Sequence, residues 1–192
     1  MKKRLIIVSA LFLSAACCQL NAQADQQAMM KAWQDYMTPG EIHKMLGKAD
    51  GEWTYEATVW MTPGAPPDKS TGTAVNKMIL GGRYQQSTHS GNIMGMPFEG
   101  QSVLGYDNAR KVFQSTWIDN MGTGIMQMEG PLDHATRSIN LTGKMTDPMT
   151  GKDVKVREKF TWVDDNTQKM EMYDTKDGKE TKTMEITFKR KV

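Results

Sequence analysis

Ten extended runs joined by short turns constrain this chain more than any other feature of its sequence. Each run is rich in Thr, Val, Tyr, Trp and Phe and is ended by turn residues such as Gly81-Gly82, Asp107-Asn108 or Asp177-Gly178. No connection is long enough for a helical crossover, so consecutive strands are expected to pair antiparallel. The runs lie at residues 52–61, 70–80, 83–90, 97–106, 111–118, 123–130, 137–144, 152–163, 167–174 and 180–190.

A row of antiparallel strands leaves two exposed edges unless the sheet closes on itself. The last three runs alternate as a closed sheet requires, with one apolar face and one charged face. The apolar members are Val154, Val156, Phe160, Trp162, Met170, Met172, Met184, Ile186 and Phe188. We therefore expect an all-β fold, an antiparallel up-and-down lipocalin-like β-barrel of about ten strands. A two-sheet sandwich, which gives a similar alternation, is the alternative.

The first 22 residues have the features of a secretory signal peptide. Lys2-Lys3-Arg4 is followed by a twelve-residue apolar run from Leu5 to Ala16, which is too short to span a bilayer. Small residues favour cleavage after Ala22 or Ala24, which predicts an exported protein, periplasmic or secreted. Lipidation at Cys17, after a segment that resembles a lipoprotein box, is the less favoured alternative.

Cleavage at this point changes both the thiol content and the charge of the chain. Cys17 and Cys18 are the only cysteines, so the mature chain has no thiol for a disulfide or for catalysis. It keeps 21 of the 24 Lys and Arg residues against 22 Asp and Glu residues, a balance that gives no reason to expect nucleic acid as a partner. With 39% hydrophobic residues, the chain is also not expected to span a membrane.

A helical pattern precedes the extended runs. Met29, Met30, Trp33 and Met37 have helix-compatible spacings, and the segment Thr38 to Glu41 then predicts a capping box, with Pro39 at the first helical position and Gly47 as the stop. We expect one or two short N-terminal helices. The predicted organisation is a signal peptide at 1–22, a helical segment at 23–50 and the barrel domain at 51–192.

Several segments resemble known families. Gly51-Glu52-Trp53, which opens the first extended run, resembles the Gly-x-Trp start of lipocalins and related calycin barrels. Six segments look like the bacterial family known as domain of unknown function 1579: PGEIHKMLGKADGEW, LGGRYQQ, MGMPFEG, GYDNARKVFQSTWIDNMGTG, DPMTGKDVKVRE and KTMEITFKRK. This resemblance implies a lipocalin-like barrel and carries no established activity. Nitric-oxide-binding haem barrels of the nitrobindin type are similar in outline, but they need a histidine from a late strand. No histidine follows His134, so haem is not expected.

Methionine is unusually abundant, with 17 residues, of which all but Met1 follow the signal segment. Three Met-x-Met pairs would each point to one side of a strand: Met94/Met96, Met126/Met128 and Met170/Met172. Thioethers select Cu(I), so a periplasmic copper-binding protein is one interpretation. Methionine also lines adaptable apolar cavities, and no His or Cys flanks the pairs. We therefore favour cavity lining and expect no metal cofactor.

Polar residues near the turns are candidate ligand anchors. Trp117, Asp119 and Asn120 lie in a glycine-rich hairpin end that a barrel would place at its rim, where the indole stacks on a ligand and the polar groups orient it. The alternative is that Asp119 and Asn120 only make the turn. Arg83 is a further candidate, for a carboxylate. The apolar link from Gly91 to Gly100 is expected to be either a lid over the barrel mouth or packing against the barrel end.

No enzyme signature is found in the sequence. Gly100 to Gly105 misses the nucleophile-elbow spacing by one residue, and the three histidines are scattered. We predict that the protein binds or carries a small apolar or amphipathic molecule in the barrel cavity without turnover. A barrel filled by its own side chains, acting as a structural or interaction module, is the alternative. The candidate ligand-binding residues are Trp53, Tyr55, Arg83, Met94, Met96, Trp117, Asp119, Asn120, Met126, Met128, Trp162, Met170 and Met172.

Overall fold

The computed structural model describes residues 23–61 and 66–191. The predicted signal peptide, with Cys17, Cys18 and the cleavage site at Ala22, lies outside the described residues. The chain forms two compact units that divide between Thr38 and Pro39. The first unit contains a helix over residues 23–37, and the second contains one further helix and the sheet. No helix within the described ranges has the length and apolarity needed to cross a membrane.

The second unit begins with the helix α2 (Glu41–Gly47), whose N-cap is Gly40. The Nδ1 atom of His43 accepts the backbone N–H of Gly40 at 3.1 Å. Thr38, the predicted cap, instead donates its hydroxyl to the carbonyl of Gln34 in the preceding helix at 2.6 Å. The cap therefore lies two residues later than predicted, because the Thr38 hydroxyl is used by Gln34 and the imidazole of His43 supplies an acceptor for the backbone N–H of Gly40.

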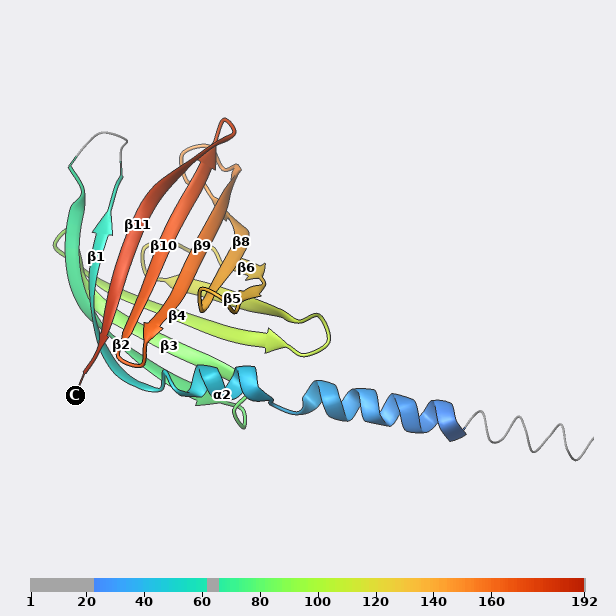
Figure 1. Cartoon of the computed structure of the whole chain (residues 1–192). Coiled ribbons are helices and arrows are strands. Elements are labelled where there is room, and N and C mark those ends of the chain that lie inside the picture. The colour runs from blue at the N-terminus through green and yellow to red at the C-terminus, as the bar shows by residue number, and fades with distance from the viewer. Residues whose placement is uncertain (1–22, 62–65, 192) are drawn as a thin grey trace, which may run out of the picture. The chain divides into compact units, whose positions relative to one another are not determined.

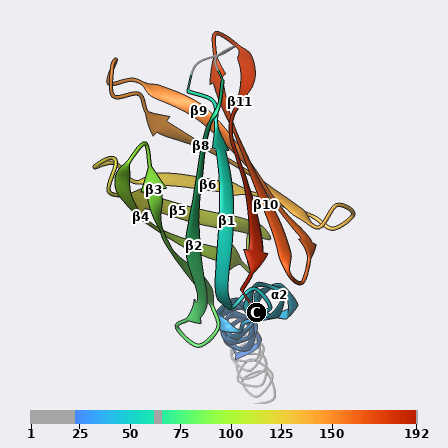
Figure 2. The same cartoon turned by 90° about the vertical axis from the view of Figure 1, so that its left-hand side faces the viewer.

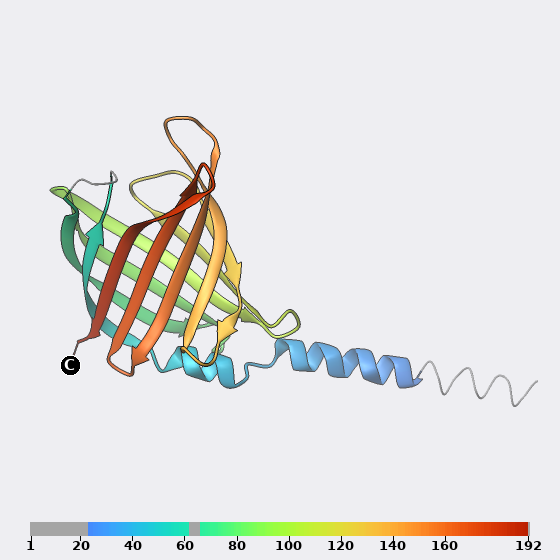
Figure 3. The ribbon, with the colours of Figure 1, turned by 45° about the horizontal axis from the view of Figure 1, so that its top comes forward.

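Eleven strands form one antiparallel sheet that closes on itself (Figures 1 and 3). Neighbours in sequence pair with each other, β1 pairs with β11, and β6 pairs with β8 to complete the ring. The two-residue β7 continues β6 beyond Pro131 along the same strand, β8, so the ring has ten strand positions. The predicted closed antiparallel barrel is therefore confirmed. The strands are β1 (Gly51–Val59), β2 (Asp68–Ile79), β3 (Tyr84–Ile93), β4 (Met96–Asp107), β5 (Val112–Asp119), β6 (Met126–Gly130), β7 (Leu132–Asp133), β8 (Ser138–Thr146), β9 (Asp153–Asp164), β10 (Thr167–Lys176) and β11 (Lys179–Arg190).

The turns use the residues that the sequence suggested. Gly81 and Gly82 both have positive φ, at 69° and 81°. The Oδ1 atom of Asp107 accepts the backbone N–H groups of Ala109 and Arg110 at 2.8 and 2.9 Å, which is an Asx-type turn. These local signals explain why the predicted strand boundaries agree closely with the structure.

The segment from Gly91 to Gly100 is a β-hairpin and not a link between strands. β3 continues to Ile93 and β4 starts at Met96, with Gly91 paired to Phe98. Only Met94 and Gly95 turn the chain, and both have positive φ, at 50° and 81°, as a two-residue hairpin turn requires. The prediction of a link from residue 91 to residue 96 between the strands is therefore wrong, because the apolar, glycine-rich composition of this segment lacks the polar alternation that marks the other strands.

The helix α2 lies across one end of the barrel (Figures 1 and 2). Leu46 is completely buried there and packs in one cluster with Phe113, Ile139 and Trp162 from three different strands. Burying this leucine anchors the helix, since a fully buried side chain of this size stabilises a fold by about 2 kcal/mol.

Hydrogen bonds hold the backbone that leaves this helix. A helix leaves its last carbonyl groups without partners of its own, and here inward barrel side chains supply them. Gln85 Nε2 donates to the carbonyl of Leu46 at 2.8 Å. Trp53 Nε1 and Asn76 Nδ2 both donate to the carbonyl of Ala49, at 2.9 and 3.2 Å. Trp53, Asn76 and Gln85 are therefore part of the barrel wall and also hold the backbone that follows α2.

Two glycines lie where β6 meets β8 and the ring closes. A Cβ atom at Gly130 would overlap the backbone carbonyl of Asn140, and one at Gly143 would overlap that of Gln127. The end of a flexible side chain could move away from such a contact, but a backbone carbonyl in a sheet ladder cannot. The closing seam therefore requires glycine at both positions.

We predict that Gly130→Ala destabilises the barrel by about 2–3 kcal/mol, because the added methyl group forces β6 and β8 apart. Urea unfolding followed by tryptophan fluorescence measures this change. Gly122→Ala is the matched control, since a Cβ there meets nothing within 4 Å. Equal stabilities of the two variants would contradict the role assigned to the seam.

Candidate functional site

The register places every second side chain of each strand inside the barrel. Tyr55 pairs with Phe188 on one side and with Gly72 on the other, and His89 pairs with Gly100. Cross-strand partners share a face of the sheet, so these rows continue around the ring. The inner surface is thus defined by the register alone.

The interior is packed at the end next to α2 and more open elsewhere. Trp53 and Phe113, near the helix, are 1% and 0% exposed. Phe160, Met170 and Ile186 also face inward, yet they are only partly buried. Side chains inside a closed barrel keep exposed surface only where the space beside them is unfilled. We call this region the accessible interior; its half-buried lining residues are His89, Trp117, Glu158, Phe160, Met170, Met172 and Ile186.

His89 on β3 lies at the centre of an aromatic cluster. Its ring centroid is 5.1 Å from that of Trp117, 6.0 Å from that of Phe188 and 6.1 Å from that of Tyr55. Phe188 lies 6.4 Å from Phe160. These distances are those of favourable edge-to-face or tilted ring pairs. Side chains from five strands therefore meet inside the barrel.

Glycines make the space that these rings occupy. A Cβ atom at Gly72 would overlap the hydroxyl group of Tyr55, and one at Gly100 would lie 2.6 Å from the ring of Trp117. The aromatic cluster and the small residues opposite it therefore form one packing unit.

The imidazole of His89 is uncharged over most of the pH range. Burial among aromatic rings lowers the pKa of His89 to about 4, because a charged imidazolium loses its hydration there. The ring forms no ion pair with any described residue. It is a neutral polar group facing the accessible interior.

Glu158 on β9 is the most unusual residue of the inner surface. It lies on the apolar face of its strand, and its cross-strand partners are Leu141 and Met172. Burial raises the pKa of its carboxyl group to about 7. Within the part of the chain that the structure describes, the carboxyl group has neither a hydrogen bond nor an ion pair. A half-buried, inward-facing carboxyl group without a partner is a group available to a ligand.

Two other carboxyl groups face inward. Burial raises the pKa of Asp174, whose Oδ1 lies 3.5 Å from the hydroxyl of Thr183. Asp119 is already occupied: Oδ2 accepts the indole N–H of Trp117 at 2.6 Å and Oδ1 accepts the backbone N–H of Met121 at 2.9 Å. Asp119 therefore orients the Trp117 ring from the end of β5.

The walls that carry His89 and Glu158 are opposite each other. β3 and β9 are separated by five steps in both directions around the ring, through β4, β5, β6 and β8 or through β2, β1, β11 and β10. Ring contacts from His89 through Phe188 to Phe160, the inward neighbour of Glu158, connect the two sides. The polar groups therefore flank one shared space.

Of the predicted anchors, Arg83 and Asn120 lie outside the barrel interior. Arg83 is exposed in the β2–β3 turn and donates to the carbonyl of Leu80 at 3.1 Å. Asn120 links β5 to the start of β4, because its Oδ1 accepts the N–H of Glu99 at 3.1 Å and its Nδ2 donates to the carbonyl of Pro97 at 3.0 Å. Both side chains therefore form their hydrogen bonds with nearby backbone groups.

The four predicted aromatic lining residues differ in how deeply they are buried. Trp53 and Trp162 are buried at the end that α2 covers, where Trp162 Nε1 has no partner among the described residues. Tyr55 is also buried, with burial raising its pKa. Trp117 is half-buried and faces the accessible interior.

The Met-x-Met pairs lie on different parts of the barrel. Met94 and Met96 are exposed at the β3–β4 hairpin end, whereas Met128 is buried and Met126 half-buried on β6. Met170 and Met172 face inward from β10, which is separated from β6 by β8 and β9. The sheet order does not put the pairs on adjacent strands. Among the described residues, no three His, Cys, Asp or Glu side chains gather as a metal ion requires.

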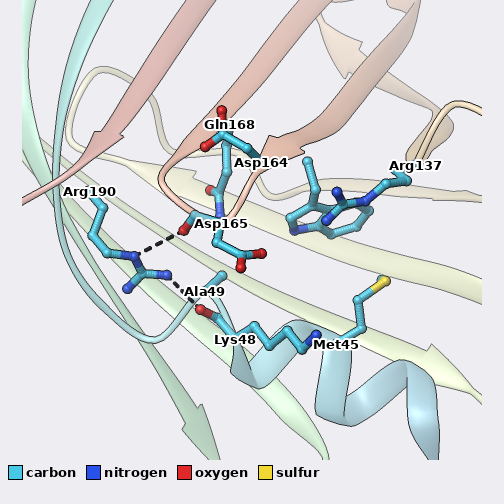
Figure 4. A pocket seen from close by; sticks show the side chains of 9 residues that line it. Met45, Lys48, Ala49, Arg137, Asp164, Asp165, Gln168 and Arg190 are labelled. Carbon is cyan, nitrogen blue, oxygen red and sulfur yellow. Dashed lines mark hydrogen bonds between the residues drawn. The ribbon is translucent and has the colours of Figure 1, made fainter.

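A hollow of about 430 Å³ lies at the α2 end, beside the β9–β10 hairpin (Figure 4). Lys48, Arg137 and Asp164 line it, together with Asp165 and Arg190. The guanidinium group of Arg190 donates to the carbonyl of Lys48 at 2.6 Å and to that of Asp165 at 3.1 Å. Arg190 therefore ties the end of the helix to the hairpin, and we assign the hollow to this structural junction.

His89 and Glu158 are not among the site residues predicted from the sequence. The position of Glu158 could have been recognised from the sequence. It is a charged residue between Val156 and Phe160, at a position where the alternation predicts an apolar, inward-facing residue. His89 gave no such indication, because it lies among Ser, Thr and Gln residues whose facing only the register settles.

Comparisons with known proteins identify the fold and the family. Residues 38–190 match the family described as "Protein of unknown function (DUF1579)". No curated protein matches the chain. The crystal structure of Rv2717c from M. tuberculosis is similar, with a TM-score of 0.61 and 13% sequence identity over 81% of this chain and 100% of that chain. At that identity the likeness concerns the fold alone.

We predict that Glu158→Gln makes the protein more stable than the wild type at pH 8, by about 1–2 kcal/mol, and leaves its stability unchanged at pH 4. The folded protein holds the proton of Glu158 up to about pH 7, whereas the unfolded chain releases it near its ordinary pKa of 4.5. The stability from this residue is therefore complete below that ordinary value and is lost as the pH rises through 7. Urea unfolding at pH 4, 6 and 8 measures the difference.

Glu185→Gln is the control for this prediction. Glu185 faces outward, and a hydrogen bond from Lys182 lowers the pKa of its carboxyl group. Its ionised form is the stabilising one, so this variant should gain no stability at pH 8. A stability difference for Glu158→Gln that is equal at all three pH values would show that burial of the carboxyl group is not its cause.

Proposed function

Since the chain belongs to the DUF1579 family of proteins of unknown function, we propose that it binds and carries a small apolar or amphipathic molecule inside its barrel. The observation that carries this proposal is the partial exposure of inward-facing side chains, among them Phe160, Met170 and Ile186. A barrel filled by its own side chains would bury them. Barrels wider than eight strands have the room for such a ligand.

The apolar lining supports this reading. Met170 and Met172 project from one strand beside Ile186 on the next, so their side chains form a continuous apolar wall. Methionine adapts its shape to irregular partners, and removal of apolar ligand surface from water supplies the affinity. The aromatic cluster at His89 bounds the same space.

The polar groups support a ligand that is not wholly apolar. Binding sites for small molecules are mostly apolar, with a few polar groups that fix orientation. His89 and Glu158 have that character, since each faces inward without a charged partner among the described residues. Binding in this picture is sequestration, with no covalent step.

Export belongs to the same proposal and is supported by the charged and apolar pattern of residues 1–22. A carrier outside the cytoplasm would take up its ligand there. We expect the intact mass of the protein from the producing cell to correspond to cleavage after Ala22 or Ala24, and a full-length mass would contradict export by this route.

Saturable binding of N-phenylnaphthylamine, a neutral apolar fluorophore, tests the proposal. We predict one bound probe per barrel, and a loss of affinity of about tenfold or more in Ile186→Trp, because the larger ring occupies the accessible interior. Ile118→Trp is the matched control: Ile118 is 46% exposed on β5, on the parity opposite to the inward Trp117. Its affinity should equal that of the wild type.

Thermal unfolding accompanies these titrations to show that both variants fold. A folded Ile186→Trp protein with undiminished probe affinity would place the probe elsewhere and overturn the proposed site. Absence of saturable binding to the wild type would favour a filled barrel that works through its outer surface.

A further inference from the structure

Away from the α2 end, the charged residues of the barrel interior all have the same sign. Among the described strands, the inward parity carries the carboxyl groups of Asp119, Glu158 and Asp174, and that of Asp68, which is exposed at the start of β2. The arginine on this parity, Arg190, lies at the α2 end over the Trp53 ring and donates to the backbone carbonyls of Lys48 and Asp50. Lys176 shares the parity of Asp174 but lies exposed at the tip of the β10–β11 hairpin. Away from the α2 end, the interior therefore holds acids with no lysine or arginine beside them.

Most basic residues of β9, β10 and β11 point outward, and several are paired there with carboxylates. Arg157, next to Glu158 in sequence, forms a bidentate pair with Glu180 at 2.7 and 2.8 Å. Lys182 pairs with Glu171 and Glu185 on the outer surface of β10 and β11. No inward rotation of these side chains is available without breaking those pairs, so Glu158 lacks an internal counter-ion.

Aromatic ring faces in the accessible interior also favour a positively charged ligand. Trp117 and Phe160 are both half-buried and border the accessible interior from opposite sides of the aromatic cluster. The faces of aromatic rings attract cations, and the attraction is stronger where water is excluded. An anion in the same place meets ring faces, apolar side chains, carboxyl groups and the uncharged imidazole of His89.

We propose that the accessible interior selects an amphipathic organic cation, an apolar amine whose ammonium group lies against Glu158 and whose apolar part lies along Met170 and Ile186. This inference rests on the proposed function, because it names the ligand class of that same interior. A protonated amine supplies the charge that Glu158 lacks and keeps the carboxyl group ionised. A carboxylate ligand of equal length would instead add a further acid to a region where no lysine or arginine faces Glu158.

Competition against bound N-phenylnaphthylamine tests the selection, with three ligands of equal chain length: octylamine, octanol and octanoate. We expect octylamine to displace the probe at a concentration at least about tenfold below that of octanoate, with octanol between them. In Glu158→Gln, octylamine should fall to the level of octanol. In Glu185→Gln, which removes an outward carboxylate, the order should be that of the wild type.

The outcomes separate this inference from the proposed function. If octanoate competes as well as octylamine, the cation preference is overturned while binding in the barrel stands. If the amine advantage persists in a folded Glu158→Gln protein, Glu158 is not the anchor. If the probe itself does not bind, the proposed function fails together with the inference.

Discussion

The pairing of β6 with β8 is the contact on which the rest of the barrel depends. Without it the sheet is an open ladder with two long edges, and the inward rows face solvent. Two glycines allow this contact, since side chains at Gly130 and Gly143 would overlap the facing backbone. Closure turns a strip of alternating residues into an inner and an outer surface, and it brings β3 opposite β9.

The position of α2 then divides the interior. Leu46 fills the space near Phe113 and Ile139, and the backbone after the helix accepts hydrogen bonds from Trp53, Gln85 and Asn76. That end is as tightly packed as an ordinary core. Beyond it the inward side chains are only partly buried, so the helix decides which part of the barrel is core and which part is available for binding.

The same alternation that separates apolar from polar residues also separates the charges. Outward acids and bases form pairs on β9, β10 and β11, and those pairs hold the bases away from the interior. Glu158 is an acid on the inward parity, and burial raises the pKa of its carboxyl group because nothing beside it compensates the charge. A binding role explains why an acid occupies a position that an apolar residue would fill at lower cost.

The sequence by itself determined the strands, their turns and the antiparallel pairing, and it favoured a closed barrel over a two-sheet sandwich. Those features depend on local periodicity and on residues such as Gly81, Gly82 and Asp107, whose preferences act over a few positions. Only the tertiary structure decided the N-cap at Gly40, the hairpin at Met94 and Gly95, and the inward place of His89 and Glu158 across the barrel. Those features depend on register and on how side chains from opposite walls share one volume, and neither quantity is contained in any short stretch of the chain.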